Sequence, residues 1–187
     1  MRQNFFPAIR LTIVCIVFFV IIYPFVIGLA AKASTNHGEG ETVTVNNKVV
    51  GYKLEGQNFS DDKYFWSRPS AVNYNAAGAG GSNKGPTNPD YLKEVQDRID
   101  TFLAHNPTVT KNEIPSELVT ASGSGLDPDL SPAAAKVQVK RIAAIRHINE
   151  QRIYALIDQN TQGPLLGILG PSKVNVLKLN VALDDLK

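Results

Sequence analysis

The stretch LTIVCIVFFVIIYPFVIGLAA, from Leu11 to Ala31, holds no charged side chain in 21 consecutive positions. A helix of that length is roughly 31 Å long, which matches a membrane hydrocarbon core of about 30 Å. Its Leu, Ile, Val and Phe residues favour insertion into a bilayer, and membrane helices tolerate a proline such as Pro24. The stretch therefore predicts one transmembrane helix over residues 11–31.

The charges on either side of this helix predict its orientation. Arg2 and Arg10 precede it, whereas Lys32 is soon followed by Glu39 and Glu41. Because cytoplasmic flanks carry the excess of basic residues, residues 1–10 are expected in the cytoplasm. The protein would then cross the cell inner or plasma membrane once and place its main domain outside.

A cleaved signal peptide is the alternative interpretation of the same stretch. Ala31-Lys32-Ala33 has the small residues at alternate positions that a cleavage site needs, and release there would give a secreted ligand-binding domain. The apolar stretch is longer than the roughly 7 to 15 residues of a signal-peptide core, which favours a retained anchor. An intact N-terminus, detected by mass, would exclude release.

The remainder of the chain is electrically balanced. Of 19 basic side chains only Arg2 and Arg10 precede residue 32, which leaves 17 basic against 17 acidic side chains from residue 32 onward. Basic stripes with interleaved aromatics do not occur there, so nucleic acid is not an expected partner. The single cysteine, Cys15, lies in the apolar stretch, so the outer domain has no thiol with which to form a disulfide.

The expected domain occupies residues 41–187 and follows a small polar tether at residues 32–40. Two β-branched runs within residues 41–55 flank Asn46-Asn47, which predicts a hairpin because Asn tolerates positive φ. Alternating apolar residues predict a closing strand over Val174–Leu183.

Three helices are predicted between these strands from apolar residues spaced three and four apart. Asn88, Ser131 and Asn149 are the expected N-terminal caps. The predicted ranges are Pro89–His105, Pro132–Arg146 and Glu150–Gln159. Strands at both ends with helices between them indicate a small α+β domain.

Two loops rich in Gly, Ser, Asn and Pro interrupt these elements, at residues 68–89 and 122–128. Loops of the first one's length in a compact domain usually carry function. Within it, residues 78–85 resemble a phosphate-binding loop in composition but lack the order of a Walker motif. The second loop precedes a helix and could bind an anion, although a tight glycine turn is the favoured interpretation.

No catalytic constellation is visible in the sequence. His37, His105 and His147 are not spaced with other ligands as a metal site requires. A serine hydrolase elbow, G-x-S-x-G, is absent from the sequence. The residues therefore indicate a non-catalytic accessory domain with a neighbour in the membrane, whereas an independent envelope enzyme would need a constellation of this kind.

Five blocks of residues occur in a fixed order between Tyr64 and Asp184. They are YFWSRPSA from Tyr64, GGSNKGPTNP from Gly80, LVTASGSGLDP from Leu118, SPAAA and QVKR from Ser131, and VNVL and LNVALD from Val174. Together they resemble the C subunit of the Kdp potassium-transporting P-type ATPase. The resemblance runs from the anchor to the C-terminus.

This resemblance implies partners in a potassium uptake pump. A channel-like subunit would pass the ion, a P-type ATPase subunit would hydrolyse ATP, and a very small subunit would stabilise the assembly. The C subunit would be needed for assembly, and the two loops are expected to order against the channel-like subunit or against each other. The residues expected to bind partners are Arg68, Gly80, Gly81, Asn83, Asn88 and Asp127.

The resemblance also implies a role for ATP, because C subunits of this family are described as raising the ATP affinity of the ATPase subunit. By position, the matching nucleotide-binding residues are Ser122, Gly123, Ser124, Gly125 and Gln138. The predicted topology places these residues outside the cell, whereas ATP is inside. Any effect on ATP affinity would therefore travel as conformational coupling through the membrane subunits. No metal or catalytic residue is expected in this chain.

Overall fold

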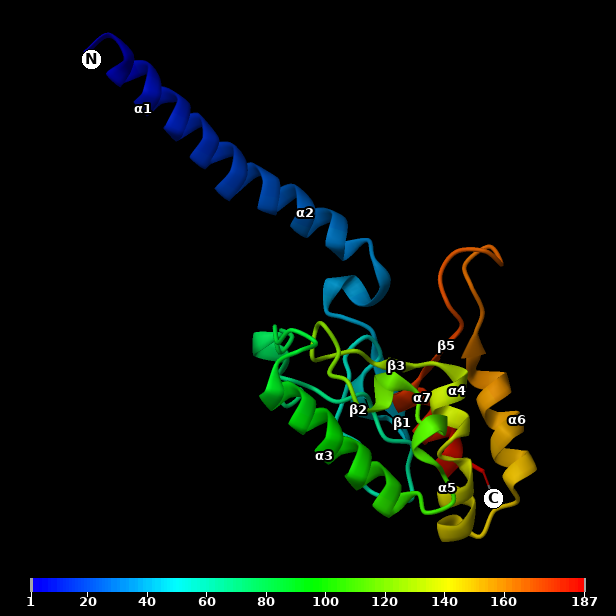
Figure 1. Ribbon diagram of the computed structural model, residues 1–187. Coiled ribbons are helices and arrows are strands. Elements are labelled where there is room, and N and C mark those ends of the chain that lie inside the picture. Colours follow the sequence, from blue (N-terminus) through cyan, green and yellow to red (C-terminus); the bar gives the residue numbers. More distant parts are fainter. Residues whose placement is uncertain (1, 187) are drawn as a thin grey trace. The chain divides into compact units, whose positions relative to one another are not determined.

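The computed structural model describes residues 2–186, and the chain divides after Glu41 into two compact units. The first unit contains one long helix, built from α1 (Arg2–Ile16), the π-helical segment η1 (Val17–Ile22) and α2 (Tyr23–Lys32) (Figure 1). The π-helical segment ends two residues before Pro24, which has no amide hydrogen to donate to the preceding turn. A short 3-10 segment, η2 (Thr35–Gly38), follows.

This helix begins nine residues earlier than the predicted start at Leu11. Its part from Asn4 to Lys32 is long and apolar enough to cross a membrane. Every side chain from Asn4 to Ala30 is exposed, including the large aliphatic and aromatic ones. The apolar surface of the helix is thus free to contact lipid or other helices.

The second unit opens with a two-stranded antiparallel hairpin, β1 (Thr42–Val45) and β2 (Lys48–Tyr52). Asn46 and Asn47 form its turn with φ values of 49° and 61°. These are the positive angles that a two-residue hairpin turn requires and that Asn adopts more readily than most residues. The predicted hairpin is confirmed.

Two of the three predicted helices are confirmed with their caps. The helix α3 (Pro89–His105) begins at Asn88, whose side chain accepts a hydrogen bond from the Tyr91 amide. The helix α6 (Glu150–Asn160) begins at Asn149 in the same manner. Short 3-10 segments lie at Ala76–Gly78, Lys111–Glu113 and Ser116–Leu118.

The prediction of one helix over Pro132–Arg146 is wrong, because the chain forms α4 (Pro132–Lys136) and α5 (Val139–Arg146) with a break between them. In a continuous helix the Ala134 carbonyl would accept the Gln138 amide. Instead it accepts the Gln138 side chain at 3.0 Å, while the Gln138 amide donates to Ala135. The side chain of Gln138 thus replaces a backbone bond at the break.

The predicted closing strand is also wrong beyond Asn175. A three-stranded antiparallel sheet has the order β3 (Asp129–Leu130), β5 (Lys173–Asn175), β4 (Thr161–Gln162). The chain then enters α7 (Val176–Asp184), capped by the Asn175 side chain, which accepts from the Lys178 amide. The apolar residues here fit a helical spacing as well as an alternating one, and short apolar runs do not distinguish the two.

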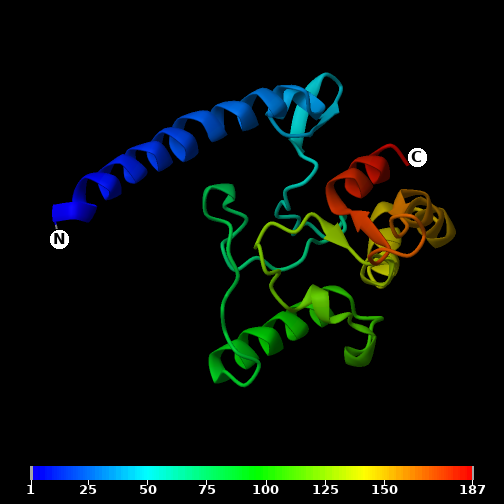
Figure 2. The same cartoon turned by 90° about the horizontal axis from the view of Figure 1, so that it is seen from above.

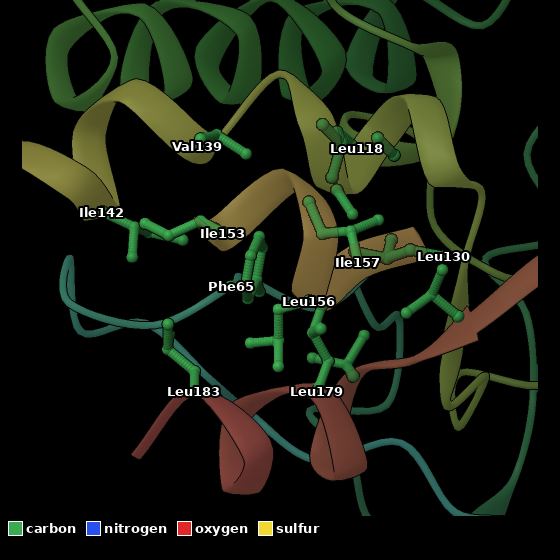
Figure 3. Packing of buried hydrophobic residues seen from close by; sticks show 14 of the residues in the cluster. Phe65, Leu118, Leu130, Val139, Ile142, Ile153, Leu156, Ile157, Leu179 and Leu183 are labelled. Atoms are coloured by element: carbon green, nitrogen blue, oxygen red, sulfur yellow. The ribbon is translucent and has the colours of Figure 1, made fainter. Parts of the chain in front are cut away.

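The core lies where α5, α6 and α7 pack around Phe65, which is fully buried at the centre of the labelled side chains in Figure 3. Figures 1 and 2 show α3 on a different side of the domain from α6 and α7. Asn180 of α7 holds the Phe65 backbone through two hydrogen bonds, at 2.9 and 3.0 Å. Helices with small antiparallel sheets make this unit an α+β domain, as predicted.

Candidate functional site

The two glycine-rich loops, residues 68–89 and 122–128, lie against each other and are called the loop pair below. The Ser122 amide donates to the Pro69 carbonyl at 3.1 Å, and the Gly80 amide donates to the Ser124 carbonyl at 2.7 Å. Arg68 Nη1 lies 2.7 Å from Asp127 Oδ2 in an ion pair across the two loops. Of the two expected alternatives, ordering of the loops against each other is therefore confirmed.

Glycines allow this close approach of the two backbones. A Cβ atom on Gly125 would lie 2.5 Å from Val72 Cγ2 and 2.8 Å from the Gly80 carbonyl oxygen, and Gly125 has a φ of +70°. A Cβ atom on Gly81 would lie 3.0 Å from the Gly123 carbonyl oxygen. Gly123 differs, because it is exposed and a Cβ atom there would meet no described atom within 4 Å.

The structure places the other predicted loop residues in different surroundings. Asn88 is committed to capping α3, whereas Asn83 is exposed with a φ of 52°. Ser122 is buried and Ser124 is exposed within the same turn. The exposed groups of the loop pair, rather than its buried ones, are therefore available to another molecule.

The Gln138 side chain makes its hydrogen bonds to parts of the domain other than the Ser122–Gly125 turn. This side chain is fully buried. Oε1 accepts from the Trp66 amide and from Arg141 Nη2, both at 2.8 Å, and Nε2 donates to the Ala134 carbonyl. In this conformation the carboxamide makes its hydrogen bonds inside the domain and is inaccessible to a nucleotide. The nucleotide role of Gln138 is not tested by this arrangement and stays a prediction.

Arg141 is the polar centre of the domain interior. Its guanidinium donates to Asn106 Oδ1 at 3.0 Å, to the Tyr64 carbonyl at 3.1 Å and to the Asp62 carbonyl. It also lies over the Trp66 ring, 4.9 Å from the ring centre. Burial lowers the pKa of Arg141 to about 10, so the group stays protonated at neutral pH.

The end of α3 carries a second polar pair beside this centre. His105 Nδ1 lies 2.8 Å from Asp62 Oδ2, and the His105 and Trp66 rings are 4.9 Å apart. A groove of about 410 Å³ runs along this side of α3, lined by Phe59, Trp66, Tyr74, Arg98 and His105 among others. Within residues 2–186, no three His, Cys, Asp or Glu side chains lie close enough together to hold a metal ion.

Comparison with known proteins bears on the whole chain. The family model described as KdpC, K+-transporting ATPase, c chain, matches residues 5–185. The chain belongs to the KdpC family. It is similar to proteins named potassium-transporting ATPase KdpC subunit from Flavobacterium psychrophilum, Bacteroides fragilis and Bacillus cereus. The identities are 54%, 52% and 43%, over 99%, 99% and 96% of this chain and 100%, 98% and 94% of the relative.

In this KdpC-family chain, the residues that organise the interior were not predictable from the sequence. Arg141 and Asn180 stand in the sequence only as members of the five blocks, and the backbone groups of Tyr64 and Phe65 that they bind are more than 70 positions away. The sequence does mark one further segment as unusual. Residues 163–171 read GPLLGILGP, with four aliphatic side chains and no charge between two Gly/Pro pairs.

An acid-sensitive contact ties the first loop of the KdpC-family domain to α3. Lys84 Nζ donates to Glu94 Oε1, and this hydrogen bond lowers the pKa of Glu94 below its ordinary value of 4.5. Stability from a carboxylate with a lowered folded-state pKa is fully present above the unfolded-state pKa. It is lost as the pH falls through the folded-state pKa.

We therefore expect hydrogen-exchange protection factors for residues 78–88 to fall when the pH drops below the Glu94 pKa. The physical reason is release of Lys84 from a protonated partner. In a Glu94→Gln control, protection should already be low at neutral pH and change little on acidification. Equal protection of wild type and control at neutral pH would contradict this account.

Proposed function

We propose that this KdpC-family chain is a non-catalytic accessory subunit of an ATP-driven potassium uptake pump and that it stabilises the assembled pump. The observation that carries the proposal is the length of the similarity. Relatives named as KdpC subunits of potassium-transporting ATPases match at least 94% of their own length and at least 96% of this chain in the three comparisons given. ATP hydrolysis would belong to another subunit.

The membrane arrangement is part of this proposal. Residues 1–10 would lie in the cytoplasm, residues 11–31 would cross the membrane, and the domain would follow the 32–40 tether outside the cell. Support comes from the flanking charges and from the bare apolar surface of the Asn4–Lys32 helix. In the absence of a hydrophobic driving force within lipid, such a helix associates with others through close packing.

The partners would be a channel-like potassium-translocating subunit, a P-type ATPase subunit and a small stabilising subunit. Exposed groups of the loop pair, such as Asn83, Gly123 and Ser124, are proposed to contact the channel-like subunit. Arg68, Gly81 and Asp127 would act by holding the two loops in one arrangement.

An increase in the ATP affinity of the ATPase subunit is proposed to act through coupling rather than contact. The buried Gln138 and the proposed location outside the membrane both favour this route. Reciprocity then requires that ATP bound to the ATPase subunit tightens the attachment of this chain to the pump. Unchanged retention of the chain with and without ATP would remove the coupling.

The test of the proposal is affinity purification of the full-length chain from its native membrane in detergent, with the bound proteins identified by mass. A channel-like subunit and a P-type ATPase recovered in a fixed ratio are the expected result. Recovery of the chain alone, from cells that express the pump, would overturn the proposal.

A matched glycine pair tests the contact role of the loop pair. Gly123→Leu should reduce recovery of the complex several-fold and leave the domain's own stability within about 0.5 kcal/mol, because Gly123 is exposed and a Cβ atom there would meet no described atom within 4 Å. Gly81→Leu should reduce both, because its Cβ would press on the Gly123 carbonyl. Parallel losses of recovery and stability in Gly123→Leu would contradict a contact role, and thermal melting measures the stability.

A further inference from the structure

Residues 163–171, GPLLGILGP, connect β4 to β5 and form the end of a hairpin that extends away from the rest of the domain (Figure 1). We call this segment the hairpin tip. Its four large side chains are exposed: Leu165 by 69%, Leu166 by 82%, Ile168 by 81% and Leu169 by 54%. Contiguous exposed aliphatic side chains of this kind mark a surface that another molecule covers.

The hairpin tip is ordered by its own backbone. Leu165 and Leu169 exchange two amide-to-carbonyl hydrogen bonds, of 2.8 and 2.9 Å. The Gly167 amide donates to the Pro164 carbonyl at 3.0 Å, and the Ile168 amide donates to the Leu165 carbonyl. Backbone groups that are already hydrogen-bonded cost less free energy to remove from water than unpaired ones. The hairpin tip can therefore be buried against another molecule at a smaller desolvation cost.

One residue of the hairpin tip has a strained backbone conformation, and no contact of its side chain with the described residues of the domain compensates for the strain. Leu166 has a φ of +55°, in the left-handed region that bulky residues avoid, and its side chain is the most exposed of the four. Gly167 and Gly170 follow with φ values of +78° and +83°. Strain of this kind persists where a particular shape is needed, and fluid lipid tails do not demand a particular shape.

Charge also distinguishes the possible occupants. Residues 161–172 carry no charged side chain, and the next residue, Lys173, is paired with Asp129 at 2.7 Å. Segments that bind membrane surfaces usually present basic side chains to anionic headgroups. The hairpin tip lacks that flank, and its uncharged, preformed shape complements an apolar pocket in a protein.

From these observations we infer that the hairpin tip inserts Leu166 and Ile168 into an apolar, uncharged pocket on the outer surface of another subunit of the pump. This inference rests on the proposed function, since it requires a partner subunit. The tip is distinct from the loop pair, so the domain outside the membrane would hold its partners through two separate surfaces.

The test compares three full-length chains, purified from native membranes by the same affinity step. In the Leu166→Asp, Ile168→Asp double variant, recovery of partner subunits should fall at least about tenfold. The reason is that burying a carboxylate in an apolar pocket is costly when no opposite charge or hydrogen-bond donor meets it there. The control is Ile145→Asp, which changes a 46% exposed aliphatic residue of α5 and should keep wild-type recovery. Thermal melting should show the same stability for all three chains.

A photoreactive residue in place of Ile168 identifies the occupant without depending on the fold of the double variant. Crosslinks to a partner subunit are expected. Crosslinks to lipid alone would overturn the inference in favour of membrane contact, as would normal partner recovery with the double variant. If the wild-type chain recovers no pump subunits, the proposed function itself fails, which separates that outcome from failure of the hairpin tip alone.

Discussion

Replacing Arg141 by methionine is expected to lower the domain's free energy of unfolding by about 3–5 kcal/mol. The change removes a buried guanidinium that donates to Asn106, to Gln138 and to the carbonyls of Asp62 and Tyr64. Asn106 Oδ1 and the two carbonyls would lose this donor, while Gln138 Oε1 would keep only the Trp66 amide. An unmet buried polar group costs about 1–3 kcal/mol. The chain between Phe59 and Trp66 should loosen first, because Arg141 fastens it to α5.

Urea unfolding of the full-length chain in detergent measures this loss. Trp66 is the only tryptophan and lies beneath the Arg141 guanidinium, so its fluorescence reports on the site directly. Lys140→Met is the matched control, since Lys140 is the neighbouring cation on the same helix and is exposed. It should change stability by less than about 0.5 kcal/mol. Equal effects of the two variants would show that the interior network is not a major source of stability.

The second large effect is expected at Gly125. Gly125→Ala should destabilise the domain by about 2–4 kcal/mol, because a Cβ atom would be strained at a φ of +70° and would press on Val72 and the Gly80 carbonyl. The two loops would have to separate to make room. Hydrogen-exchange protection in residues 69–82 should fall together with the global stability.

Gly123→Ala is the control for Gly125→Ala, two positions away in the same turn. Its Cβ would meet no described atom, and replacement of glycine where there is no strain is neutral or stabilises by up to about 1 kcal/mol. The two alanine variants should therefore differ in the size, and even the sign, of their effect on the unfolding free energy. Similar losses in both would contradict the close packing of the loop pair.

Elements whose signals are local were predictable. The apolar helix needs only its own uncharged residues, and α3 and α6 needed only their spacing and the caps Asn88 and Asn149. The hairpin at Asn46-Asn47 followed from the conformational preference of Asn. Each of these signals lies within a few positions of the element that it specifies.

The candidate site was predicted only in part. The composition of the two loops singled them out, and either mutual packing or partner contact was left open for them. The choice depends on hydrogen bonds between Pro69 and Ser122 and between Gly80 and Ser124, across more than 40 positions. The composition of either loop alone cannot supply that pairing.

By itself, the sequence determined the single apolar span, the neutral domain after it and the family to which the five blocks point. Tertiary structure alone decided that α7 is a helix, that α4 and α5 are separate, and that Gln138 and Arg141 face inward. The physical reason is that an amphipathic pattern specifies which residues are apolar but not which polar group finds a partner. Several partners of Gln138 and Arg141 lie in the segment around Trp66, more than 70 positions away, and only the folded chain brings them within hydrogen-bonding distance.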